Sequence, residues 1–144
     1  MAGILLDTNV ISELMRSCPE QAVMDWFAQR THELFYISAI TQAEIQLGIA
    51  LLPVGKRRQM LADAASEMFA RDFAGRCLPF DASSAPNYAA IVAARRRSGH
   101  GTSTEDALIA AIALTHGYPL ATRNTKDFLR SEEHTSELQS LAYL

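Results

Sequence analysis

Short apolar runs recur along the chain, each bounded by polar residues, glycine or proline. They are rich in the branched and aromatic residues that favour β-strands. The runs predict four strands, over residues 3–7, 34–38, 77–80 and 120–122. Pro79 weakens the third strand, because proline has no N–H to donate to a neighbouring strand.

Between these runs, apolar residues repeat every three or four positions, which is the spacing of one helix face. The repeats predict six helices, over residues 8–15, 20–30, 41–52, 56–73, 82–98 and 103–116. Gly117 suits the end of the last helix. That helix is rich in alanine and isoleucine, so we expect both of its faces to be buried.

Strands that alternate with helices are typical of an α/β domain with a mostly parallel sheet. The length of 144 residues suits a single domain of this kind. In parallel sheets, binding sites form at the carboxyl ends of the strands. Polar side chains at those ends are therefore the first candidates for function.

The composition is that of a folded globular protein, with 49% hydrophobic and 20% charged residues. A formal net charge of −3 shows no basic excess, so any nucleic-acid binding would depend on local basic residues or on a metal that offsets carboxylates. Cys18 and Cys77 lack the spacing of a disulfide framework or a zinc site. No apolar run reaches the ~18–20 residues that span a bilayer, so we expect a cytoplasmic protein with no membrane partner.

The end of the chain differs from the rest. Residues 130–140 read RSEEHTSELQS, with the period of neither a strand nor a helix. They resemble the in-frame translation of a common sequencing adapter, and the alternative is an ordinary polar tail. We expect a domain over residues 1–129, a non-native tail over residues 130–144, and a sheet that lacks its last strand.

Acids and amides fall at the expected sheet edge. Asp7 ends the first strand, Glu44 and Asp106 each lie one turn into a helix, and Asn124 and Asp127 follow the last strand. If the sheet is parallel, these side chains face one cleft. Crowded carboxylates repel one another unless a cation intervenes, and oxygen ligands suit Mg²⁺ or Mn²⁺. Such a site can activate water for an in-line displacement at phosphorus.

Each acid also has a simpler structural interpretation. Asp7 suits the N-cap of the following helix. Thr41 and Glu44 fit a capping box, and Ser103 and Asp106 fit a looser form of it. The recurrence of an acid at each expected position is what favours a functional site.

Three blocks carry a resemblance to a known family: LLDTNVISEL (5–14), ITQAEIQLGI (40–49) and STEDALIAAIALTHGYPLATRNTKDF (103–128). Together they resemble PIN-domain proteins, above all the VapC/FitB-type toxins of bacterial toxin–antitoxin pairs. The resemblance covers essentially residues 3–128. It implies a three-layer α/β/α domain and an Mg²⁺- or Mn²⁺-dependent endoribonuclease that cuts single-stranded RNA.

The resemblance also implies roles for individual residues. Asp7, Glu44 and Asp106 would bind the metal and position the attacking water. Asn124 stands where many PIN domains have an acid, and it joins the metal site together with Asp127, for which the alternative is a helix cap.

The remaining roles concern residues around the metal. The implied groups that orient the carboxylates are Thr8, Asn9, Ser103 and Thr122. Arg123, which we expect close to the site, is predicted to contact an RNA phosphate.

Partners follow from the resemblance alone: a second copy of the chain in a homodimer, and a small DNA-binding antitoxin encoded by a neighbouring gene. Two other functions are weighed. One is a catalytically impaired PIN-fold module for binding or dimerisation, with truncation as the cause. The other is an aspartate-nucleophile phosphatase, suggested by LLDTN but opposed by Asn9, which stands where that motif needs a second acid.

Overall fold

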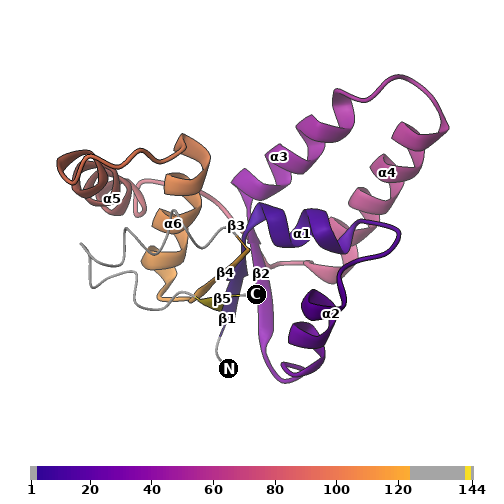
Figure 1. Ribbon diagram of the computed structural model, residues 1–144, viewed down its shortest axis with the longest axis horizontal. Coiled ribbons are helices and arrows are strands. Elements are labelled where there is room, and N and C mark those ends of the chain that lie inside the picture. The colour runs from indigo at the N-terminus through magenta and orange to yellow at the C-terminus, as the bar shows by residue number, and fades with distance from the viewer. Residues whose placement is uncertain (1–2, 124–141, 144) are drawn as a thin grey trace.

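The computed structural model describes residues 3–123 and 142–143. Within these residues the chain forms one parallel sheet of five strands in the order β3-β2-β1-β4-β5 (Figure 1). The strands are β1 (Gly3–Leu6), β2 (Leu34–Ser38), β3 (Cys77–Leu78), β4 (Leu120–Thr122) and β5 (Ala142–Tyr143). Each strand pairs with its neighbours in parallel, as the alternation of strands and helices predicts.

Six α-helices connect and flank the described strands, and all six lie where the apolar repeats predict them. They are α1 (Thr8–Leu14), α2 (Gln21–Ala28), α3 (Ala39–Ala50), α4 (Lys56–Glu67), α5 (Ala85–Arg97) and α6 (Thr104–His116). The helix predicted over residues 56–73 is divided, because α4 ends at Glu67 and a π-helical turn, η1 (Met68–Asp72), follows it.

Side chains of β1 alternate between the two faces of the sheet and separate two apolar cores. Leu5 packs with α5 and α6 on one face, whereas Ile4 and Leu6 pack with α1, α2, α3 and α4 on the other. Figure 1 shows the two groups of helices on either side of the strands. The fold is therefore the three-layer α/β/α arrangement that the resemblance implies.

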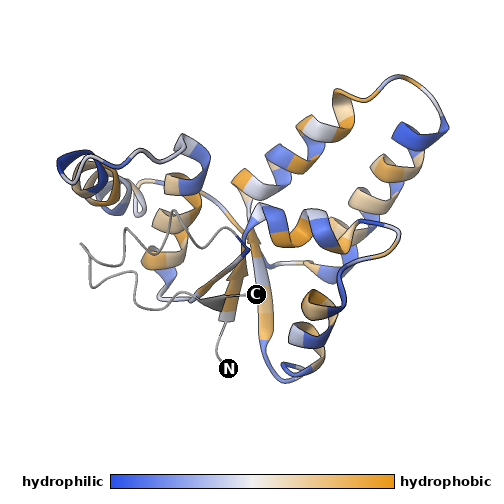
Figure 2. Ribbon diagram, viewed as in Figure 1, coloured by the Kyte–Doolittle hydropathy of each residue, from blue (hydrophilic) through white to orange (hydrophobic). Residues whose placement is uncertain are grey.

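Helix α6 is the most deeply buried of the described helices. Every residue from Ile109 to Ala113 is buried, which confirms the prediction from its alanine and isoleucine content. By contrast, α3 and α4 extend away from the sheet as a two-helix arm (Figure 1). The loop at its tip carries the exposed apolar residues Leu51 and Val54, and the start of α4 beside it is hydrophilic (Figure 2). Met60, on the apolar stripe predicted for α4, is 69% exposed, because that end of the arm lies beyond the sheet.

The sheet does not lack a fifth strand, which corrects one prediction. Ala142–Tyr143 forms β5 beside β4, with Ala121 aligned to Ala142. A sheet edge offers unpaired N–H and C=O groups to any extended segment within reach, whatever the origin of that segment. The assignment of residues 130–144 to a non-native tail remains a prediction. Among the described helices, none is long and apolar enough to cross a membrane.

Candidate functional site

An open cavity of about 520 Å³ lies at the carboxyl end of β1, where α1 begins. It is lined by Asp7, Thr8, Asn9, Ser12, Glu13, Arg16, Glu44 and Asp106. The structure thus brings together the three predicted acids Asp7, Glu44 and Asp106, which come from separate segments. We call this space the acidic cavity.

Asp7 follows β1 directly and is 2% exposed. Its Oδ1 accepts a hydrogen bond from the Thr8 N–H at 2.8 Å, and its Oδ2 accepts one from the Thr122 hydroxyl at 2.7 Å. Burial raises the pKa of Asp7 from 3.8 to about 6; these two hydrogen bonds oppose the rise, and the charges of Asp106 and Glu44 add to it. Asp7 is therefore both the N-cap of α1 and a carboxylate whose charge is poorly compensated.

A chain of hydroxyl groups orients Glu44. The Thr8 hydroxyl donates to Glu44 Oε1 at 2.7 Å and lies 2.9 Å from the Thr41 hydroxyl. Because a hydroxyl has a single hydrogen to donate, Thr41 must be the donor to Thr8. Ser38 in turn donates to the Thr41 oxygen at 3.4 Å. The predicted orienting role of Thr8 thus has a physical basis, and Ser38 and Thr41 join it.

The capping box predicted at Thr41 and Glu44 is wrong. Helix α3 begins at Ala39, and its N-cap is Ser38, whose side-chain oxygen accepts from the Thr41 N–H at 3.0 Å. The helix starts directly after β2 with no intervening loop, so Thr41 already lies inside its first turn. Glu44 is consequently not used for capping and turns its carboxylate to Thr8.

Asp106 lies in the first turn of α6, and Ser103 is the N-cap of this helix, as predicted. The Ser103 hydroxyl oxygen accepts from the Asp106 N–H at 3.1 Å. Ser103 therefore acts on the position of Asp106 through the backbone at the start of the helix.

The end of β4 is tied to α1 by two contacts. Besides the bond from Thr122 to Asp7, the Arg123 N–H donates to Asn9 Oδ1 at 3.2 Å. Asn9 holds the end of β4 by this hydrogen bond, and its predicted role in orienting a carboxylate stays a prediction. Asn124 and Asp127 lie outside the described residues, and their metal-binding roles stay predictions.

Glu13 is a site residue that the sequence reasoning missed. It is 5% exposed and accepts hydrogen bonds from the Glu20 N–H at 2.8 Å, from Arg16 Nη1 and from Arg123 Nη1. The Glu20 N–H is the main cause that lowers the pKa of Glu13, and both arginines add to the effect. In the sequence, Glu13 is one polar position in a helical repeat, which does not indicate burial. Its partners Glu20 and Arg123 belong to other segments, so only the folded structure brings them to it.

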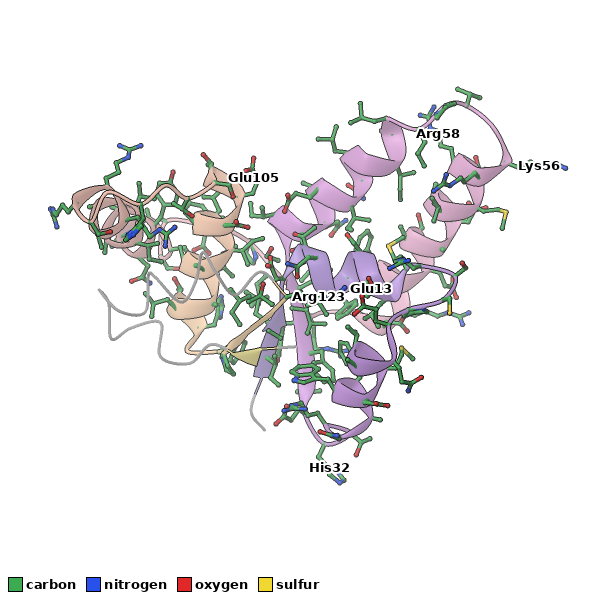
Figure 3. All side chains as sticks on the ribbon, viewed as in Figure 1. Glu13, His32, Lys56, Arg58, Glu105 and Arg123 are labelled. Carbon is green, nitrogen blue, oxygen red and sulfur yellow. The ribbon has the colours of Figure 1, made fainter. Side chains whose placement is uncertain are left out.

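Arg123 is engaged by carboxylates in this structure. Its Nη1 lies 2.8 Å from Glu13 Oε1 and its Nη2 lies 2.6 Å from Glu20 Oε2. Figure 3 shows Arg123 and Glu13 side by side. The phosphate contact predicted for Arg123 would require one of these ion pairs to break.

The donor set suits a hard cation. Asp7, Glu44 and Asp106 supply oxygen ligands, which Mg²⁺ and Mn²⁺ prefer. Within residues 3–123 and 142–143, no three acids, histidines or cysteines already enclose a point where a metal ion would sit. Mg²⁺ keeps several of its own waters and needs only one or two protein carboxylates, so the residues fit a largely hydrated ion.

A second, apolar groove of about 900 Å³ continues from the acidic cavity between α1, α3 and α4. The two spaces share Thr8, Ser12, Arg16 and Glu44. The large apolar residues of the groove are Met15, Ile45, Ile49, Leu52, Met60 and Leu61. The acids therefore lie at one end of an apolar channel on the protein surface.

Comparison with known proteins matches residues 4–133 to the PIN domain. The chain is 46% identical over 125 residues to plasmid stability protein StbB of Pseudomonas syringae pv. tomato, covering 87% of this chain and 90% of that protein. It is 42% identical over 125 residues to VapC ribonuclease Y4jK of Sinorhizobium fredii, covering 87% and 89%.

A third relative, toxin FitB of Neisseria gonorrhoeae, is 42% identical over 129 residues, which is 90% of this chain and 93% of FitB. The crystal structure of FitAcB from the same organism superimposes with a TM-score of 0.81 at 38% identity, covering 98% of this chain and 96% of that one. These matches extend over nearly the whole chain and include the segments that line the acidic cavity. The chain belongs to the PIN domain family and, within it, to the group of VapC- and FitB-type toxin ribonucleases.

Proposed function

We propose that this chain is a metal-dependent endoribonuclease that cleaves single-stranded RNA with an activated water, as the toxin of a toxin–antitoxin pair in the cytoplasm. The observation that carries the proposal is the acidic cavity, where Asp7, Glu44 and Asp106 meet from three separate segments. Burial is the main cause that raises the pKa of Asp7, and repulsion by the charges of Asp106 and Glu44 adds to the rise. A bound cation removes that repulsion, and the names of the VapC relatives add support for RNA as the substrate.

Mg²⁺ or Mn²⁺ would be held by Asp7, Glu44 and Asp106, and there it supplies a Lewis acid for the phosphate and a water of lowered pKa. The protein residues keep the ligands in place. Thr8 and Thr122 each donate to Asp7 and leave lone pairs on both of its oxygens. The hydroxyl of Thr8 holds Glu44 by Oε1. A carboxylate held in this way needs little rearrangement when the cation arrives.

The first test is calorimetric titration of the chain and its Asp106→Asn variant with Mn²⁺. We expect binding by the parent chain and its loss in the variant. Glu67→Gln is a matched control, because Glu67 is an exposed acid paired with Arg71 on the arm and lines neither the acidic cavity nor the apolar groove. A folded parent that does not bind Mn²⁺ would overturn the nuclease proposal and favour a non-catalytic binding module.

The second test asks for the reaction itself. Total bacterial RNA incubated with the chain and Mn²⁺ is expected to be cut at internal positions, and a chelator or Asp106→Asn is expected to abolish cleavage. Mn²⁺ binding without any RNA cleavage would leave a metal-binding protein with a different substrate.

We also propose an antitoxin partner that docks in the apolar groove. A peptide with an apolar face suits the side chains of the groove, and a basic residue on it suits the adjoining carboxylates. Co-expression with the product of the neighbouring gene is expected to yield a stable complex that no longer cleaves RNA. A gene without such a neighbour, or a product that does not bind, would contradict this part of the proposal.

A homodimer is the remaining proposed assembly, and it stands on the resemblance to VapC and FitB proteins. Light scattering after size-exclusion chromatography is expected to give twice the 15.8 kDa mass of the chain. A monomer at all accessible concentrations would contradict it.

A further inference from the structure

Arg16 stands out among the residues around the acidic cavity. Of the described residues that line this cavity, Arg16 alone is basic, and four others are carboxylates. It also lines the apolar groove, so it lies where the two spaces join. Its side chain is 62% exposed, so the guanidinium is within reach of a molecule that enters from solvent.

Arg16 and Arg123 share one carboxylate but are held very differently. Arg123 lies 2.8 Å from Glu13 and also pairs with Glu20, and its side chain is 30% exposed. Arg16 lies 3.2 Å from both oxygens of Glu13 through the same nitrogen, Nη1. Of the two arginines, Arg16 has the longer and more exposed contact, so it is the one more easily released.

Glu13 stays compensated when Arg16 leaves. The Glu20 N–H and Arg123 both continue to donate to its oxygens. Moving Arg16 to another anion therefore does not leave a buried charge without a partner, which is the large penalty in breaking most buried ion pairs. The same movement by Arg123 would break at least one of two shorter ion pairs, at 2.8 Å and 2.6 Å.

We propose that Arg16 is a substrate-binding residue that contacts an RNA phosphate next to the bond held in the acidic cavity. This inference rests on the proposed function and replaces Arg123 as the candidate phosphate contact. A planar guanidinium can donate two parallel hydrogen bonds to a phosphate. The present contact of Arg16 with Glu13 uses only Nη1, so its other nitrogens are available to donate. A cation at the mouth of a cavity with four carboxylates also lowers the repulsion that an incoming phosphate meets.

The test compares Arg16→Gln, Arg16→Lys and the control Arg71→Gln with the parent chain. Arg71 is 77% exposed, pairs with Glu67 at the end of α4 and lines neither space, so its substitution removes an equal charge elsewhere. The probe is labelled single-stranded RNA of random sequence. Its binding is measured by fluorescence anisotropy with Ca²⁺, which takes oxygen ligands in a looser geometry than Mg²⁺, and its cleavage is measured with Mn²⁺.

We expect Arg16→Gln to bind RNA about three- to tenfold more weakly, with the loss in KM and little change in kcat. The slope of log affinity against log salt should fall by about 0.7, the value for one contact to a single-stranded phosphate. Arg16→Lys should lie between the parent and Arg16→Gln. Arg71→Gln should match the parent in both quantities.

Equal affinity and equal salt slope for Arg16→Gln and the parent would overturn the inference while leaving the nuclease intact. An equal loss in Arg71→Gln would also overturn it, because the effect would then be one of net charge. RNA binding that depends on Arg16 without cleavage by the parent would instead count against the nuclease and support the phosphate contact. A parent that binds no RNA would overturn both.

Discussion

Replacing Asp7 with asparagine removes one buried negative charge while keeping the shape of the side chain. Asparagine is as good an N-cap as aspartate, so its Oδ1 is expected to keep the hydrogen bond from the Thr8 N–H. The Thr122 hydroxyl now donates to Asp7 and must turn to accept from the new amide. We predict that this substitution makes the metal-free protein more stable at neutral and alkaline pH.

The magnitude follows from the pKa of Asp7, which rises from 3.8 to about 6 on folding. At about 1.4 kcal/mol per pH unit, ionisation of Asp7 destabilises the folded chain by about 3 kcal/mol. The sign follows from proton binding: between these two pKa values the folded state holds more protons than the unfolded state, so stability falls as pH rises. The penalty is absent below pH 3.8 and complete above about pH 6.

In the variant, two hydrogen bonds to a charged acceptor are replaced by weaker hydrogen bonds of a neutral amide, which offsets part of this gain. We therefore expect Asp7→Asn to raise the free energy of unfolding by about 1–3 kcal/mol at pH 8. The gain should shrink as pH is lowered toward 4. Urea unfolding at pH 8 and at pH 4, in the presence of a chelator, measures the difference in the free energy of unfolding between the two chains. Equal m-values would show that both chains expose the same surface on unfolding.

Adding Mn²⁺ should make the parent chain more stable than Asp7→Asn, the reverse of the order without metal. A cation that binds only the folded chain at a hundred times its dissociation constant stabilises it by about 2.7 kcal/mol, and Asp7→Asn should gain little. Asp63→Asn, at an exposed position on α4, serves as the control and should leave stability nearly unchanged at both pH values. A variant that is less stable than the parent at pH 8, by an amount independent of pH, would refute the reasoning that Asp7 carries an uncompensated buried charge.

Three further predictions concern single contacts. Thr8→Val removes the hydroxyl that orients Glu44, so Mn²⁺ affinity measured by calorimetry should fall about tenfold or more, and unchanged affinity would show that Glu44 needs no such support. Arg123→Gln breaks the ion pairs of Arg123 with Glu13 and Glu20, so that Glu13 keeps only the exposed Arg16 as a cation. The midpoint of urea unfolding should therefore fall further in this variant than in Arg71→Gln, and equal midpoints would contradict this. Gly3→Ala places a methyl group 2.8 Å from Tyr36 and 2.9 Å from Tyr118, so unfolding should cost about 1–3 kcal/mol less, and a neutral result would mean that both rings move freely.

The sequence alone determined most of the elements and the sheet edge that carries the site. Strand and helix periods are local properties, so the strand over residues 34–38 and the helix over residues 103–116 were predicted within a residue of their observed bounds. The placement of Asp7, Glu44 and Asp106 followed from one topological rule, because parallel strands and the helices after them share an edge.

Tertiary structure decided how those acids are held and which arginine is available to a ligand. The bond from Thr122 to Asp7 joins residues 115 positions apart, and that from Arg123 to Glu13 joins residues 110 apart. No local pattern encodes such pairs, because they depend on β4 lying beside β1 in the finished sheet. The burial of Glu13, the tethering of Arg123 and the exposure of Arg16 therefore arise only when the chain is folded.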